Sequence, residues 1–169
     1  MTIKTHSFRT SNLTPNTLHI ASQLITQGAD REKIINNLYR TKSVNMLKLW
    51  GRALARLEFD EENKIAWTQI TSKDFSVTKT SPDNIKGLLE ELITETPMAH
   101  IIVLLYEKDN YTYALISTKN HYNALNLTKE FEPTGNRNLA KIIFPNKPLI
   151  EFQVELLESI KKNLKQRLI

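Results

Sequence analysis

The sequence predicts an α+β protein in which an N-terminal helical segment precedes a mixed β-sheet domain with flanking helices. Apolar residues recur at helical spacing in the first third of the chain. Later segments alternate apolar and polar residues around polar turns, and amphipathic helices stand between and after them. We place the boundary between the two parts after residue 56, so that residues 57–169 form the sheet domain.

The first third contains three predicted helices. Thr14 caps the first, Pro15 suits its first turn, and Gly28 ends it. Asp30 caps a second helix and Ser43 a third. Helical spacing predicts the apolar face of the third helix, which consists of Val44, Leu47, Trp50, Leu54 and Leu57. These helices either pack on one another or link the sheet domain to another unit.

Two hairpins are predicted in the sheet domain. Alternation across a polar turn pairs residues 57–59 with residues 64–70. Residues 99–106 are nearly all apolar, which is typical of a buried strand, and residues 111–116 return beside them. Helices complete the domain: one begins at Ser81-Pro82, a short one is capped by Asn123, and a long one starts near Ile150.

Composition narrows the range of functions. The 23 Lys and Arg residues exceed the 18 Asp and Glu residues, and the net charge of +5 tolerates a polyanionic partner without requiring one. The absence of cysteine excludes disulfides and thiolate metal sites, and the four histidines have no carboxylates at metal-ligand spacing. No apolar run has the length of a signal peptide or a membrane span, so we expect a cytoplasmic protein without a membrane partner.

A polar segment between two apolar stretches, residues 131–140, is the candidate anion site. Gly135 permits an unusual backbone angle, and Arg137 presents planar donors that suit a phosphate or a carboxylate. The same residue types are also typical of an ordinary surface turn, which is the simpler interpretation.

The order of several short segments along the chain carries a resemblance to a known family. These segments are residues 8–15, 28–30, 37–39, 49–54 and 65–68. In this order the chain resembles the C-terminal part of the DHH/DHHA1 phosphoesterases, the group of nanoRNases, oligoribonucleases and nucleotide phosphatases. The resemblance covers almost the whole chain. It implies that residues 1–56 are linker helices leaving a DHH domain, and that residues 57–169 form a DHHA1-like substrate-binding domain.

In that family a Gly-Gly-Gly-His loop followed by two small residues binds substrate phosphate, and the candidate anion site falls in its place. Only Gly135 and Ala140 keep the pattern, while Leu139 and Lys141 stand where small residues are usual. Pro133 lacks an amide proton, which weakens a phosphate cradle.

Other departures modify the site without removing every donor. Glu132 carries charge of the same sign as phosphate, but Asn136 in place of the His still donates a hydrogen bond, and Arg137 supplies positive charge. Where the family has Arg-Ser-Lys at a strand end, this chain has Ser117-Thr118-Lys119, so the Arg is missing. The resemblance thus implies a substrate-phosphate site made of Thr118, Lys119, Thr134, Gly135, Asn136 and Arg137.

The family's metal ligands, including the Asp-His-His triplet, do not occur in this sequence, and Lys4 falls near the position of a late acidic ligand. The resemblance implies that this chain has no catalytic residue, metal ligand or cofactor of its own. Manganese is expected only in the missing DHH domain.

Two functions remain open. In the first, the chain is the part of a phosphoesterase that binds a nucleotide or a short RNA, and hydrolysis requires a DHH domain. Alternatively, it is a structural or protein-interaction module that kept the fold and lost the site. In that case the N-terminal helices offer an apolar surface to a DHH domain, to another protein or to a second copy of the chain.

Overall fold

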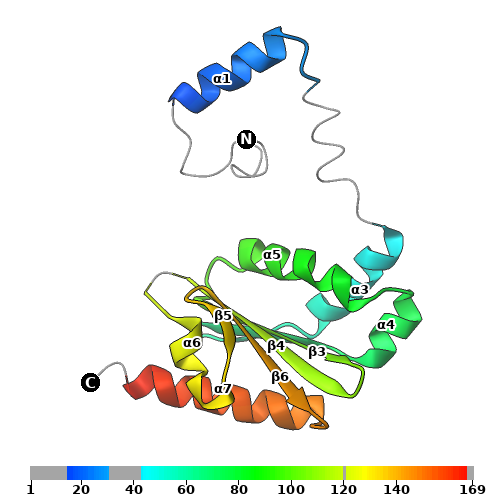
Figure 1. Ribbon diagram of the computed structural model, residues 1–169, viewed down its shortest axis with the longest axis vertical. Coiled ribbons are helices and arrows are strands. Elements are labelled where there is room, and N and C mark those ends of the chain that lie inside the picture. Colours follow the sequence, from blue (N-terminus) through cyan, green and yellow to red (C-terminus); the bar gives the residue numbers. More distant parts are fainter. Residues whose placement is uncertain (1–14, 31–42, 120, 167–169) are drawn as a thin grey trace. The chain divides into compact units, whose positions relative to one another are not determined.

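The computed structural model describes three stretches of the chain: residues 15–30, 43–119 and 121–166. They belong to two compact units, Met1–Ser43 and Val44–Ile169 (Figure 1). The unit that holds the sheet therefore begins at Val44, inside the segment that the sequence analysis assigned to the linker. The physical reason is the packing of one helix of that segment on the sheet, which is described below.

The first unit contains helix α1, Pro15–Thr26. Gly28 ends this helix as predicted, because its φ of 92° lies in the left-handed region that favours glycine. The amide of Gly28 donates to the carbonyl oxygen of Ile25, and that of Ala29 to Leu24, which satisfies the last carbonyls of the helix. The second predicted helix, after Asp30, lies outside the described residues.

A mixed sheet forms the centre of the second unit. Its six strands lie in the order β1-β2-β3-β4-β6-β5, and β2 and β3 are parallel while every other neighbouring pair is antiparallel. The strands are β1 (Glu58–Asp60), β2 (Ile65–Ile70), β3 (Ile101–Lys108), β4 (Tyr111–Thr118), β5 (Thr134–Asn136) and β6 (Leu139–Pro145).

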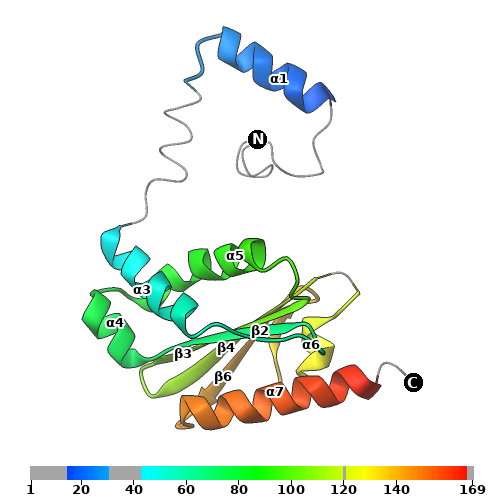
Figure 2. The same ribbon diagram turned by 180° about the vertical axis from the view of Figure 1, so that it is seen from behind.

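Helices cover both faces of this sheet, which confirms the predicted α+β class. Figures 1 and 2 show α3, α4 and α5 on one face and α6 and α7 on the other. The helices are α3 (Val44–Ala55), α4 (Ser72–Thr78), α5 (Ile85–Glu95), α6 (Ala124–Leu127) and α7 (Leu149–Gln166), with 3-10 turns at Pro82–Asn84 and Lys129–Phe131. No helix within the described ranges is long and apolar enough to cross a lipid bilayer.

Both predicted hairpins are confirmed. Phe59 of β1 pairs with Ala66 of β2, and β3 pairs with β4 over their whole length. The turn of the second hairpin has Asp109 and Asn110 at φ of 50° and 63°, the left-handed conformation that a tight hairpin turn requires. The predicted buried strand is also confirmed, since every residue of β3 as far as Tyr106 is buried.

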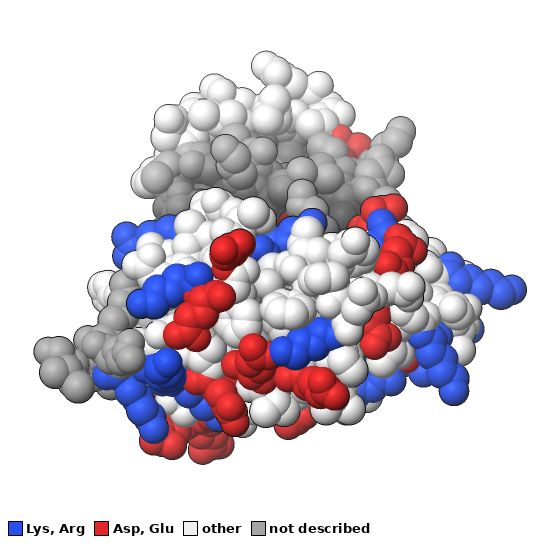
Figure 3. All heavy atoms as spheres, turned by 60° about the horizontal axis from the view of Figure 1, so that its bottom comes forward, with Lys and Arg blue, Asp and Glu red and all other residues white. Residues whose placement is uncertain are grey.

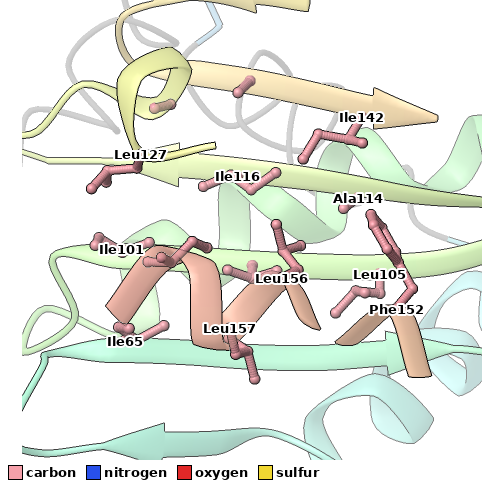
Figure 4. Packing of buried hydrophobic residues seen from close by; sticks show 14 of the residues in the cluster. Ile65, Ile101, Leu105, Ala114, Ile116, Leu127, Ile142, Phe152, Leu156 and Leu157 are labelled. Atoms are coloured by element: carbon pink, nitrogen blue, oxygen red, sulfur yellow. The ribbon is translucent and has the colours of Figure 1, made fainter. Parts of the chain in front are cut away.

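The sheet separates two apolar clusters. On the α7 face, Phe152 and Leu156 pack against strand residues such as Leu105 and Ile116 (Figure 4). On the opposite face, α3, α4 and α5 bury Ile102, Leu104 and Tyr106 with their own apolar residues. A sheet covered on both faces explains why β3 is a continuous apolar run.

The predicted face of α3 was wrong in part. Trp50 is buried, but the other buried residues of the helix are Leu49 and Ala53, whereas Val44, Leu47 and Leu54 are exposed. Packing on β2 selects this face: Thr68 Oγ1 donates to the Ala53 carbonyl oxygen at 2.5 Å, within the buried layer.

Helix α4 and the two strands β5 and β6 were not predicted from the sequence. Helix α4 begins with a capping box, in which Thr71 Oγ1 accepts from the Asp74 amide and the Asp74 carboxylate accepts from the Thr71 amide. Strand β6 pairs with β4 along its whole length and makes the candidate anion site part of a hairpin with β5.

Candidate functional site

Pairing of β4 with β6 brings the two halves of the candidate site together. The Thr118 amide donates to the Asn138 carbonyl oxygen at 2.9 Å, and Thr118 Oγ1 donates to the Arg137 carbonyl oxygen at 3.1 Å. The Ala124 amide, at the start of α6, donates to the same Arg137 oxygen at 2.7 Å. The end of β4 and the turn at Arg137 therefore form one hydrogen-bonded unit.

Thr118 holds this turn with its side chain. The residue is buried, and Oγ1 also lies 3.4 Å from the Tyr122 carbonyl oxygen. Since both of its partners are backbone carbonyls, the hydroxyl anchors the loops on either side of α6. The Thr118 side chain, assigned to phosphate from the sequence, thus fixes the backbone of its neighbours.

The candidate turn is a short hairpin in which Arg137 and Asn138 link β5 to β6. Gly135 has a φ of 128°, and a Cβ atom there would lie 2.2 Å from the Leu139 carbonyl oxygen. This position therefore requires glycine. Thr134 is exposed on β5, and its Oγ1 donates to the Lys141 carbonyl oxygen at 3.3 Å.

The Asn136 side chain accepts hydrogen bonds from backbone amides that, in a phosphate-binding loop, would donate to the ligand. Its Oδ1 accepts from the amides of Asn138 at 2.9 Å and Leu139 at 3.1 Å. A glycine loop leaves such donors open to an anion, whereas this turn satisfies two of them itself. Anion binding at this turn thus depends on side-chain charge more than on a backbone cradle.

Arg137 supplies that charge. Its side chain is exposed, and within the described ranges it takes part in no ion pair. A guanidinium in this position can donate two parallel hydrogen bonds to one phosphate or carboxylate.

Lys119 is engaged elsewhere. Its Nζ donates to the Thr96 carbonyl oxygen at 3.0 Å, and its amide donates to the His100 carbonyl oxygen at 2.8 Å. Burial lowers the pKa of the Lys119 ammonium. In this arrangement Lys119 joins the end of β4 to the segment before β3, and an anion would have to compete with Thr96 for it.

The described residues contain no group of three or more His, Asp or Glu side chains placed to hold a metal ion. On the face of the molecule shown in Figure 3, acidic and basic side chains are interspersed. The second unit also pairs some of its charges: Lys161 Nζ lies 2.8 Å from Asp60 and Lys162 Nζ lies 3.6 Å from Glu130. This face offers no continuous positive surface to a polyanion.

The sheet face that carries α3, α4 and α5 holds residues that were not recognised from the sequence, because no strand was predicted for residues 139–145. Ile143 of β6 lies directly opposite Tyr113 of β4, and Lys141 lies opposite Leu115. The Lys141 ammonium stands over the Tyr113 ring, 5.3 Å from its centroid. Burial alternates along β6, where Ala140 and Ile142 are buried between exposed neighbours, but the sequence shows this alternation only weakly because Leu139 and Ile143 are apolar.

The sequence matches no protein-family model and no curated protein. Solved structures share the fold. An exopolyphosphatase-related protein from Bacteroides fragilis is 19% identical with a TM-score of 0.79, and the alignment covers 96% of this chain and 47% of that one. A pGpG-specific phosphodiesterase, PggH from Vibrio cholerae, is 10% identical with a TM-score of 0.54, over 90% of this chain and 52% of that one. This chain thus spans about half the length of each.

Proposed function

We propose that this chain binds the phosphate of a nucleotide or a short RNA at the turn around Arg137. It would serve as the substrate-binding half of a DHH-type phosphoesterase. Hydrolysis would require a metal-binding DHH domain outside these 169 residues. The observation that carries the proposal is the convergence of the end of β4 with the exposed Arg137 at one corner of the sheet.

Two further points support the proposal. The sequence resembles the linker helices and DHHA1 domain of that family, and the fold is shared with the two longer proteins named above, which are described as exopolyphosphatase-related and as a pGpG-specific phosphodiesterase. Fold similarity alone does not transfer an activity, so the contact with phosphate must come from the turn itself.

A second candidate function is a structural or protein-interaction module without a ligand site. The hydrogen bonds from the Asn138 and Leu139 amides to Asn136 favour it, because a turn that satisfies its own amides has less to offer an anion. The engagement of Lys119 with Thr96 points the same way. Partners would then be a DHH domain, another protein or a second copy of the chain.

Titration calorimetry with adenosine 3′,5′-bisphosphate tests the first function on Arg137→Ala and on a matched control, Lys73→Ala. Both substitutions remove one positive charge, but Lys73 is an exposed residue of α4. A hydrogen bond to a charged group contributes roughly 1.5–3 kcal/mol, so Arg137→Ala should weaken binding about 10- to 100-fold. Lys73→Ala should leave the affinity nearly unchanged. Equal affinities for the two variants would contradict the phosphate site.

A further inference from the structure

In the part of the second unit that the structure describes, side chains of β6 remain exposed on the sheet face that carries α3, α4 and α5. Leu139 and Ile143 on this strand are 37% and 49% exposed, although their neighbours Ala140 and Ile142 are buried on the other face. Tyr111 of β4 is exposed on the same side as Tyr113. We call the surface made by Tyr111, Tyr113, Leu139, Lys141 and Ile143 the open face.

A tyrosine stack ends at the open face. The rings of Tyr106 on β3 and Tyr113 on β4 are stacked, with centroids 4.8 Å apart and planes within 7° of parallel. Tyr106 is buried, so one end of the stack is closed. On β6 the cross-strand neighbour of Tyr113 is Ile143, and the Lys141 ammonium lies over the Tyr113 ring. A third tyrosine, Tyr111, has its ring centroid 6.4 Å from that of Tyr113.

We propose that a nucleobase of a short oligonucleotide stacks on Tyr113 above Ile143 and extends the Tyr106–Tyr113 stack by one ring. Stacking on tyrosine accepts any base, because every base has a π-face. The exposed side chain of Ile143 forms an apolar floor, and Tyr111 borders the site.

Two positive side chains, Lys141 on the open face and Arg137 in the turn beyond it, suit a ligand that carries phosphates. Lys141 takes part in no ion pair with any described residue, and neither does Arg137. An oligonucleotide brings a base for the aromatic ring and phosphates for both cations, so a single ligand satisfies all three groups. Lys141 would move from the ring to the backbone of the ligand.

The spacing of the two subsites sets the length of the ligand. Lys141 pairs with Thr134 of β5, so the open face continues into the strand that leads to Arg137. The part of this path that lies on β6 runs from Leu139, two residues after Arg137, to Ile143, which is four strand steps of about 3.3 Å, or roughly 13 Å. This span suits a dinucleotide or a longer strand. The phosphate end of the inference rests on the proposed function, whereas the base subsite stands on its own contacts.

Affinity for 5′-phosphorylated diadenylate tests the base subsite. Tyr113→Leu removes the ring and should weaken binding about tenfold, whereas Tyr113→Phe keeps the ring and should bind as the wild type does. The matched control is Phe59→Leu, which removes an exposed aromatic ring from β1 at the other edge of the sheet. Circular dichroism shows whether each variant is folded. Equal affinities for Tyr113→Leu and the wild type, or equal losses in Tyr113→Leu and Tyr113→Phe, would overturn the inference.

Adenosine, which has no phosphate, separates the inference from the proposed function. In an NMR titration it should shift the ring resonances of Tyr111 and Tyr113 in the wild type and in Arg137→Ala alike. If it does so while Arg137→Ala binds the diadenylate normally, the phosphate site fails and the base subsite stands. If Arg137→Ala weakens binding but adenosine leaves Tyr113 unshifted, the base subsite is refuted and the phosphate site remains.

Discussion

Removing the charge of Asp74 tests how α3 and α4 are held together. The Asp74 carboxylate is buried at the start of α4 and accepts from Arg56 Nη1 at 2.5 Å and from Arg52 Nη1 at 3.1 Å, both on α3 or directly after it. It also accepts from the amide and the hydroxyl of Thr71, both at 2.9 Å. Asp74→Asn keeps the shape of the side chain and removes the charge.

The expected cost of Asp74→Asn is about 2 kcal/mol of unfolding free energy. Hydrogen bonds between charged groups contribute roughly 1.5–3 kcal/mol, and breaking a fully buried ion pair costs about 3–5 kcal/mol. The lower part of this range applies, because the Arg52 and Arg56 side chains are 42% and 35% exposed and can turn toward water.

The contribution of the Asp74 carboxylate to the free energy of unfolding depends on pH in one direction. Burial alone would raise the pKa of Asp74, but the hydrogen bonds from Arg56 and Thr71 outweigh it and hold the pKa below its usual range. The carboxylate therefore stabilises the fold at every pH above its unfolded pKa of about 3.9, and this contribution is lost as the pH falls toward the folded pKa. The difference between wild type and Asp74→Asn should shrink as the pH falls below about 4.

Urea unfolding followed by circular dichroism measures this difference at neutral and acid pH. Asp109→Asn is the matched control, because it removes the same charge from a side chain that is 80% exposed in the turn of a hairpin. It should change the stability by less than about 0.5 kcal/mol. If Asp74→Asn costs no more than Asp109→Asn at neutral pH, the ion pairs of α3 and α4 do not contribute as argued.

Two further pairs of substitutions, each a test and its control, examine the turn and the core. Gly135→Ala places a Cβ atom 2.2 Å from the Leu139 oxygen at a φ of 128° and should cost roughly 1–3 kcal/mol, whereas Gly51→Ala, with nothing within 4 Å, should be neutral or stabilising. Phe152→Ala in the α7 core should cost about 3–5 kcal/mol, and Val154→Ala on the exposed side of α7 less than about 0.5 kcal/mol. Urea unfolding measures all four, and a cost that is equal within either pair would contradict the corresponding packing.

Local patterns were sufficient to predict the two hairpins and the helices α5, α6 and α7. Alternation, turn residues and helix caps act over a few residues, and the Asn123 cap of α6 is an example. Strand β6 was not predicted because Leu139 and Ile143 are apolar although they lie on the exposed face. The alternation of apolar and polar residues that marks a strand was therefore weak. Helix α4 was too short to show a helical periodicity of apolar residues, although Thr71 and Asp74 have the residue types and the spacing of a capping box.

The candidate site was predictable only in its residue types. Thr118 and Arg137 are distant in the sequence, and their contact follows from the pairing of β4 with β6. The two hydrogen bonds that Asn136 Oδ1 accepts from backbone amides depend on the geometry of the turn, which cannot be read from the sequence pattern. The position of Lys141 over Tyr113 likewise requires the register between strands.

Titration calorimetry of the wild-type chain with adenosine 3′,5′-bisphosphate, at low and moderate salt and with and without manganese, tests the central claim most directly. A phosphate site that depends on Arg137 predicts binding that weakens as salt is added and is indifferent to manganese. Absence of binding at low salt, or affinity that is unchanged by salt, would contradict the claim and favour an interaction module.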